Sequence, residues 1–149
     1  MKIWVDADAS PRDVKDVLIR ASQRRKVSVV FVANRTLNLP MSSRLEMVAV
    51  AAGADVADDH IADNCSAGDL VVSADVPLAA RVVESGGVVI QPRGRVLDRE
   101  NIDEALSIRN FGDSLRASGI ETGGPPPFKP GDKQKFSNAL DRWLTINGF

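Results

Sequence analysis

The sequence predicts an α/β protein in which helices wrap a central, mainly parallel five-stranded sheet. Short runs of apolar, often β-branched residues alternate with segments of helical period, as in sheets built from crossover units. The runs are apolar almost throughout, which is typical of strands covered on both faces. None of the runs approaches the roughly 20 residues that a membrane-spanning helix needs, so we expect no membrane association.

The expected elements follow one another in a regular order. After the first strand, Ser10 is predicted to be the N-cap of a helix, and Pro11 suits the first helical position. The apolar residues of this helix recur with the spacing of one buried face. The expected strands are 2–6, 27–33, 47–51, 70–73 and 87–90, and the later helices are 55–65, 76–84 and 102–117.

The C-terminal part is predicted to contain one loop and one helix. Residues 121–131 are too rich in Gly and Pro for regular structure, so we expect an extended loop there. Residues 132–147 place Phe136, Leu140 and Trp143 at helical spacing, and this favours a packed helix. The alternative is a linker to a disordered tail.

Length and charge restrict the class of protein. A chain of 149 residues can form one domain, 1–149, with a proper core. Its net charge of −1 gives no global attraction to nucleic acid, so such affinity must come from a local patch. The single Cys65 cannot form an internal disulfide, and no charged segment followed by an apolar one opens the chain, so we expect a cytoplasmic protein.

Aspartates follow several of the predicted strands. In open α/β sheets, ligands bind beyond the carboxyl ends of the strands, so these carboxylates should meet at one edge. N-capping is the ordinary explanation for Asp55 and Asp75. It does not explain Asp6, because a carboxylate at the end of a central strand is costly to bury without a partner. The aspartates at this edge are Asp6, Asp8, Asp55, Asp58, Asp59 and Asp75.

Crowded carboxylates bind protons or a hard divalent cation, so this edge predicts a site for Mg²⁺ or Mn²⁺. Cys65 and His60 are single residues and do not make a zinc site. The pair Asp6 and Asp8 with the later Gly68–Asp69 also resembles the haloacid-dehalogenase phosphatases. Asp69 precedes the strand 70–73, however, and should lie at the opposite edge of the sheet as a turn residue.

Six motifs in order resemble the YaiI/YqxD family of uncharacterised bacterial proteins. They are WVDADASP (4–11), FVAN (31–34), AAGADVADDHI (51–61), GDLVVSADVPLAA (68–80), the triplet 109–111 and SGIETGGP (118–125). The resemblance covers nearly the whole chain. The family has no assigned reaction, and it usually carries cysteine where this chain has Ser10.

This family is similar to the PIN-like nucleases, whose fold is a three-layer α/β/α sandwich. The resemblance implies that Asp6, Asp58 and Asp75, with Ser73, take the places of the nuclease acids and the Ser/Thr of their motif. A further acid is typical of these nucleases. Glu46 is the weak candidate for it, and Asp8 or Asp55 is the substitute.

Other polar residues are candidates for contact with a substrate. Asn34 follows the second strand and suits a phosphate or a turn equally well. Arg109 and Arg116 are candidates for phosphate because the resemblance includes their segment, and Gly123 and Gly124 could bring backbone N–H groups to a phosphate or shape a turn. A basic cluster closing the first helix is interpreted as a solvated helix end; its residues are Arg20, Arg24, Arg25 and Lys26.

The expected function is a metal-dependent nuclease, that is, a phosphodiesterase acting on RNA or another nucleic acid. In this hypothesis Asp6, Asp58 and Asp75 hold the cation. The alternative is a non-catalytic protein of the same fold that binds RNA or a nucleotide.

Overall fold

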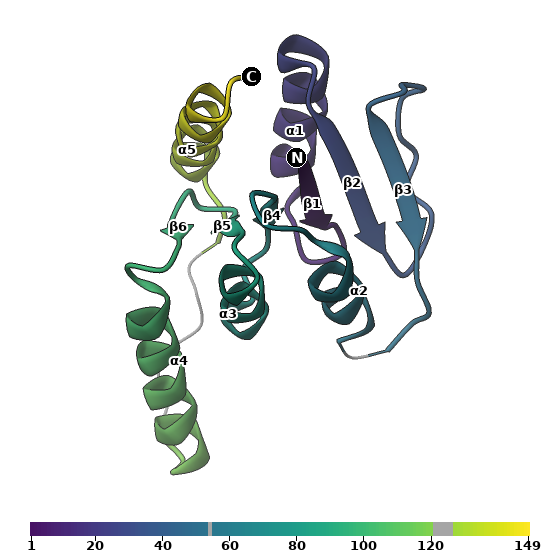
Figure 1. The fold of residues 1–149 in the computed structure, drawn as a ribbon. Helices are drawn as coiled ribbons and strands as arrows, with labels where there is room; N and C mark the ends of the chain where they lie inside the picture. Colours follow the sequence, from purple (N-terminus) through teal and green to yellow (C-terminus); the bar gives the residue numbers. More distant parts are fainter. Residues whose placement is uncertain (54, 121–126) are drawn as a thin grey trace.

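The computed structural model describes residues 1–53, 55–120 and 127–149, which form one sheet flanked by helices (Figure 1). In these residues the strand order is β3-β2-β1-β4-β5-β6. The strands are β1 (Lys2–Asp6), β2 (Ser28–Ala33), β3 (Leu45–Ala49), β4 (Leu70–Val72), β5 (Val88–Ile90) and β6 (Val96–Leu97). The first five are parallel, and β6 is antiparallel to β5. The predicted mainly parallel sheet is confirmed, with one strand more than expected.

The position of β1 decides which residues meet at the carboxyl edge of the sheet. It pairs with β2 on one side, where Asp6 lies opposite Val32, and with β4 on the other, where Val5 lies opposite Val72. Asp6 therefore ends a strand beside the strand that leads into Ser73 and Asp75. The predicted central place of the first strand is confirmed.

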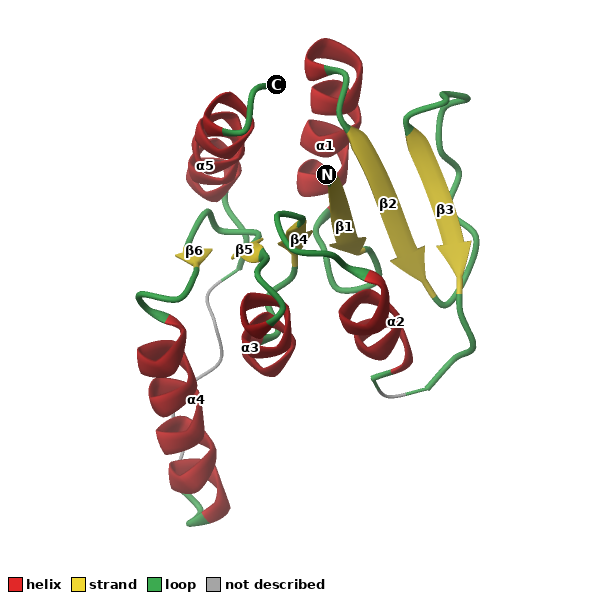
Figure 2. Cartoon of the chain, viewed as in Figure 1, coloured by secondary structure: helices red, strands yellow, loops and turns green. Residues whose placement is uncertain are grey.

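Helices cover both faces of the sheet and complete a three-layer α/β/α arrangement (Figure 2). One face packs against α1 (Arg12–Arg25) and α5 (Pro130–Ile146). The other face packs against α2 (Val56–Asn64), α3 (Val76–Glu84) and the start of α4 (Ile102–Ala117). None of the described helices is long and apolar enough to cross a membrane.

Successive side chains of the central strands point to opposite faces of the sheet, and each face has its own core, so these strands are apolar almost throughout. In β1, Ile3 and Val5 enter the core under α1 and α5, whereas Trp4 enters the core under α2 and α3. In β2, Phe31 and Val32 divide in the same way. Both faces of these strands are buried, and Lys2 at the start of β1 is the one exposed residue on β1 and β2.

Ser10 does not cap α1, so this prediction was wrong. The residue at the N-cap is Pro11, and no side chain caps this end. Ser10 is buried and donates its hydroxyl hydrogen bond to the backbone oxygen of Asp6 at 2.7 Å. It thereby closes the turn after β1 and holds the end of the strand against the start of the helix.

The C-terminal helix is packed, as predicted, and begins two residues earlier than expected. Proline is favoured at the first helical position, and the carboxylate of Asp132 accepts the backbone N–H of Lys129 at 3.0 Å. The end of the chain is anchored where the guanidinium of Arg25 donates to the backbone oxygen of Phe149 at 2.8 Å. The buried face of the helix consists of Phe136, Leu140, Trp143 and Leu144. Residues 121–126 of the predicted loop lie outside the described residues.

Candidate functional site

An open pocket of about 490 Å³ lies at the carboxyl edge of the sheet, and we call it the acidic pocket. Its walls come from the ends of β1 and β2, the start of α2 and the turn that leads into α3. Its lining contains carboxylates, one amide and small residues, and no cationic side chain. The lining residues are Asp6, Asp8, Ala9, Asn34, Gly53, Asp55, Ala57, Asp58, Ala74 and Asp75.

Asp6 is the buried acid of this pocket, with 7% of its surface exposed. The hydroxyl of Ser73 donates to its Oδ2 at 3.3 Å, and Ser73 Oγ in turn accepts the backbone N–H of Asp75 at 3.1 Å. Burial raises the pKa of Asp6, the hydrogen bond from Ser73 opposes this, and the charges of Asp75 and Asp8 raise the pKa further. Ser73 therefore ties the ends of β1 and β4 together at the bottom of the pocket.

Asp58 and Asp75 form a close pair of carboxyl groups. Asp58 lies in the first turn of α2, and its pKa is raised to about 6. The causes in order of size are burial, the charges of Asp75, Asp6 and Asp55, and a hydrogen bond shared with Asp75. Two acids that share a hydrogen bond have a strong affinity for a proton or for a cation placed between them.

Asp75 has two roles in the structure. Its Oδ1 accepts the backbone N–H of Leu78 at 2.8 Å, so it is the N-cap of α3 as well as part of the acidic pocket. Asp55 was expected to cap α2 in the same way, and this expectation was wrong. It occupies the N-cap position with φ of 65°, but its side chain accepts no hydrogen bond from the helix. Its carboxylate lines the pocket instead.

Asp8 and Asn34 join the turn after β1 to the end of β2. The Oδ2 atom of Asp8 accepts the backbone N–H of Asn34 at 2.7 Å. Both residues are exposed, and both line the pocket. The second oxygen of Asp8 and the amide side chain of Asn34 are thus placed at the mouth of the pocket, where a solvated ligand first arrives.

The donor set fits Mg²⁺ or Mn²⁺ held by few protein ligands. Among the described residues, no three His, Cys, Asp or Glu side chains lie close enough together to form a complete ligand set. Mg²⁺ does not require one, because it commonly keeps several waters and takes one or two carboxylates. Asp58 and Asp75 are the residues that could hold such an ion directly. Of the other two carboxylates, Asp6 is buried and Asp8 is exposed.

Other predicted site residues lie elsewhere. Glu46 is an exposed residue of strand β3, opposite Val30, and does not line the acidic pocket. Arg109 and Arg116 are exposed on α4, and neither lines the acidic pocket. Arg109 pairs with Asp113 at 3.0 Å, and Arg116 pairs with the same carboxylate. Gly123 and Gly124 lie outside the described residues.

Asp69 lies at the opposite, amino edge of the sheet, as predicted for a turn residue. It is buried, with 5% of its surface exposed. Its carboxylate accepts the backbone N–H of Lys2 at 2.9 Å, the indole N–H of Trp4 at 3.0 Å and the backbone N–H of Ser66 at 2.8 Å. Asp69 therefore fastens β1 to the start of β4 and cannot share a ligand with Asp6.

Small residues in the pocket wall were missed in the interpretation of the sequence. Ala9, Ala57 and Ala74 each lie next to an aspartate in the chain and also line the acidic pocket. The recurring pairing of alanine with aspartate is a signal that was available. Small neighbours leave room around the carboxylates for an ion with its water shell.

Comparison with known proteins places the chain in a family. Residues 4–146 match the family model described as "Uncharacterized BCR, YaiI/YqxD family". A UPF0178 protein of Desulfotalea psychrophila is 55% identical over 144 residues, covering 97% of each chain. A UPF0178 protein of Myxococcus xanthus is 54% identical over 145 residues, covering 97% of this chain and 95% of its own.

A UPF0178 protein of Saccharophagus degradans is 51% identical over 145 residues, with 97% and 96% of the two chains covered. No solved structure matches the chain. The full-length family match and the identity of about half the residues to several bacterial relatives lead to one conclusion. The chain belongs to the YaiI/YqxD family.

Proposed function

We propose that this protein is a divalent-metal-dependent phosphodiesterase that hydrolyses RNA or another nucleic acid. One observation carries the proposal: Asp6, Asp58 and Asp75 meet in one pocket, where burial and the charge of Asp75 raise the pKa of both Asp6 and Asp58 and no cation among the described lining residues compensates them. A divalent cation held there would relieve this repulsion and would give a phosphate a positive centre to approach.

The similarity to PIN-like nucleases supports the same assignment. In those proteins an acid ends the first strand, a second acid lies on the helix before the fourth strand, and a Ser/Thr-x-Asp follows that strand. Here Asp6 ends β1, Asp58 lies on α2 before β4, and Ser73 and Asp75 follow β4. The order and placement of these residues agree with that pattern.

The residues of the acidic pocket have different roles in such a reaction. When bound, a divalent cation supplies Lewis acidity toward the phosphate and lowers the pKa of a water molecule. Asp58 and Asp75 would hold the cation, with Asp58 in its deprotonated form, which predominates at pH 7 because its pKa is about 6. Ser73 orients Asp6 by its hydrogen bond. Asp8 and Asn34, linked at 2.7 Å, position the substrate at the mouth of the pocket.

A second candidate function is non-catalytic binding of RNA or a nucleotide by the same fold. The observation that favours it is the absence of a complete three-residue ligand set among the described residues. Glu46, the weak candidate for a further acid, lies on the exposed edge strand β3, outside the acidic pocket.

The test is cleavage of labelled single-stranded RNA in the presence of Mn²⁺, compared between the wild type and Asp75→Asn purified in parallel. We expect slow cleavage by the wild type and none in EDTA, which removes the cation. We expect none by the variant, because the cation loses a negatively charged ligand. Asparagine caps a helix about as well as aspartate, so α3 and the melting temperature should be preserved.

Asp98→Asn is the matched control. Asp98 also accepts a backbone N–H, from Glu100 at 2.9 Å, but it lies outside the acidic pocket. This variant should cleave RNA like the wild type. Equal cleavage by Asp75→Asn and the wild type would remove Asp75 from the mechanism. Binding of Mn²⁺ by a wild type that cleaves nothing would favour the non-catalytic alternative.

A further inference from the structure

A second pocket, of about 480 Å³, lies between the β5–β6 turn and α5, and we call it the basic pocket. Four of its lining residues are cationic, and none is acidic. The lining residues are Arg93, Gly94, Arg95, Val96, Lys135, Asn138, Ala139 and Arg142. Although the net charge of the chain is −1, positive charge is therefore concentrated in this pocket.

The turn that forms one wall is held closely against α5. Gly94 has φ of 93°, and a Cβ atom placed on it would lie 2.6 Å from the carbonyl carbon of Lys135. The turn is closed by two backbone hydrogen bonds of 2.8 Å, from Gly94 to Gln91 and from Gln91 to Arg95. The cationic side chains of the turn are thus presented on a fixed backbone beside the helix.

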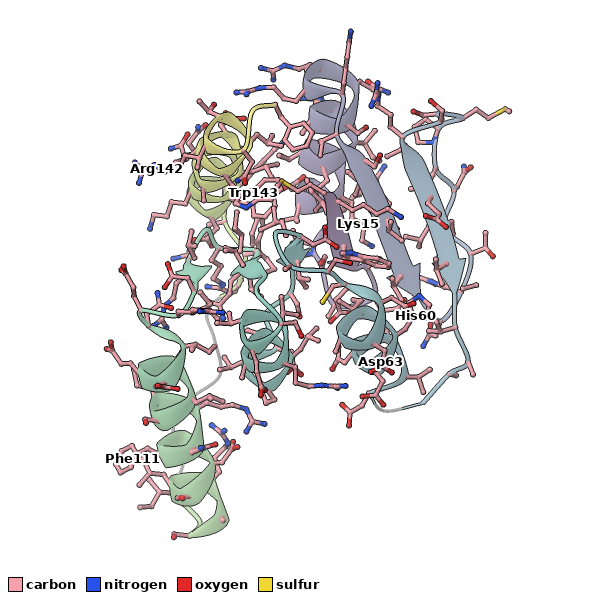
Figure 3. All side chains as sticks on the ribbon, in the orientation of Figure 1. Lys15, His60, Asp63, Phe111, Arg142 and Trp143 are labelled. Atoms are coloured by element: carbon pink, nitrogen blue, oxygen red, sulfur yellow. The ribbon has the colours of Figure 1, made fainter. Side chains whose placement is uncertain are left out.

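The cations on α5 are spaced along the helix. Lys135 and Arg142 are seven residues apart, which places them on one face about 10 Å from each other. Figure 3 shows Arg142 pointing away from α5 on the opposite side from Trp143, which is buried. No ion pair of Arg95, Lys135 or Arg142 is found within the described residues. Their charge is available to an anionic ligand.

One wall of the basic pocket, the β5–β6 turn, lies at the same edge of the sheet as the acidic pocket. The β5–β6 turn follows the carboxyl end of β5, and Ile90 at that end lies opposite Val72 of β4 in parallel register. The chain after Val72 leads into Ser73 and Asp75 of the acidic pocket. A strand of nucleic acid running along this edge can therefore contact both pockets.

The far flank of α5 is also basic. A smaller pocket of about 130 Å³ between α1 and α5 has four cations and one acid in its lining: Arg20, Arg24, Arg25 and Lys133, and Asp141, which pairs with Arg25 at 4.0 Å. The basic cluster at the end of the first helix, interpreted from the sequence as a solvated helix end, thus continues the charge across the layer formed by α1 and α5. Extended positive charge suits a polymer of phosphates better than a single small anion.

We propose that the basic pocket binds the phosphate backbone of single-stranded RNA, with Arg95, Lys135 and Arg142 each contacting a phosphate. The choice of RNA rests on the proposed function. The separation of Lys135 and Arg142 exceeds the size of one phosphate group, so the two side chains contact different phosphates of one strand. The side-chain Oδ1 of Asn138 accepts from Gln134 at 2.9 Å, which leaves its amide nitrogen as a further donor between them.

The experiment measures binding of a fluorescently labelled single-stranded RNA of about 12 nucleotides by anisotropy, in EDTA and over a series of salt concentrations. The variant combines Arg95→Gln, Lys135→Gln and Arg142→Gln. We expect its affinity to fall at least about tenfold and the slope of log affinity against log salt to become shallower by about 2, because three phosphate contacts are lost.

The control for the loss of a surface cation outside the basic pocket is Arg99→Gln, which removes one charge from an exposed arginine that follows β6 at the amino edge of the sheet. It should bind RNA like the wild type, and all variants should keep the wild-type melting temperature. EDTA separates binding from cleavage, so a wild type that binds RNA but cleaves none contradicts the proposed function alone. An unchanged salt slope in the triple variant, an equal loss in Arg99→Gln, or no RNA binding by the wild type would overturn the inference.

Discussion

Two buried aspartates at opposite edges of the sheet differ in how their charge is compensated. Asp69 accepts three N–H groups at the amino edge. Asp6 accepts one hydroxyl at the carboxyl edge and lies among other carboxylates, so that its pKa is raised by burial and by Asp75 and Asp8. The first arrangement stabilises the fold, whereas the second is costly and is typical of a functional site.

This difference predicts opposite effects of the same substitution on the metal-free protein. Asp6→Asn removes a poorly compensated charge and keeps an oxygen for Ser73, so the melting temperature in EDTA should be unchanged or slightly higher. Asp69→Asn places an amide against N–H donors and should lower the free energy of unfolding by about 2–4 kcal/mol. For a chain of this length that is a loss of roughly 5–15 °C.

Thermal melts of the two variants beside the wild type, all in EDTA, make the comparison. A clear loss of stability in Asp6→Asn would contradict the metal-site interpretation of that residue. An unchanged Asp69→Asn would contradict the bridging role of Asp69 between β1 and β4.

At the scale of the elements, most of the fold could be predicted because burial on both faces leaves long apolar runs. β6 was missed, since a strand of two residues has no periodicity to detect. The cap of α1 was assigned wrongly because Ser10 had two backbone partners within reach, and its hydroxyl bonds the strand end rather than the helix. Similarly, Asp55 has the residue type of an N-cap, but its backbone φ of 65° is not the extended conformation in which such caps work.

Two glycines, Gly94 beside α5 and Gly131 within its first turn, provide a test of how closely the β5–β6 turn packs against that helix. Gly94→Ala should lower the free energy of unfolding by about 2–4 kcal/mol, because a Cβ at φ of 93° is strained and would collide with the backbone of Lys135. Gly131 lies in the first turn of α5, and a Cβ there would meet nothing within 4 Å. Gly131→Ala should therefore be neutral or stabilising by about 0.5–1 kcal/mol.

Denaturant unfolding of both variants measures these differences. Equal free energies of unfolding for Gly94→Ala and Gly131→Ala would mean that the β5–β6 turn can move away from α5 without loss of stability. That result would also remove the fixed wall of the basic pocket.

At the scale of the whole molecule, residues far apart in the chain give the carboxyl edge both an acidic and a basic pocket. The acidic pocket could be anticipated, because each aspartate follows a recognisable strand and the carboxyl ends of parallel strands meet. The basic pocket could not, because Arg95 and Lys135 come from segments with no shared motif and the net charge of −1 conceals a local excess. Only the packing of a turn on a helix brings them together.

Because an acidic and a basic pocket meet the same edge of the sheet, we expect RNA binding to depend on pH when no metal is present. The pKa of Asp58 is raised to about 6, so lowering the pH from 7 to 5 adds a proton to the folded protein there and removes a negative charge from the acidic pocket. Repulsion of a neighbouring phosphate then falls, and we expect the affinity for single-stranded RNA in EDTA to rise by about threefold at moderate salt.

Asp58→Asn is the variant that tests this, because the asparagine side chain carries no negative charge at pH 7 or at pH 5. It should bind RNA more tightly than the wild type at pH 7 and equally at pH 5. The single histidine, His60, is present in both proteins, so its protonation cancels in the comparison. The same pH dependence in both proteins would show that the RNA does not pass the acidic pocket. A dependence lost only in Asp58→Asn would place one strand of RNA across both pockets, with its phosphates held by the basic pocket and one of them brought to the carboxylates.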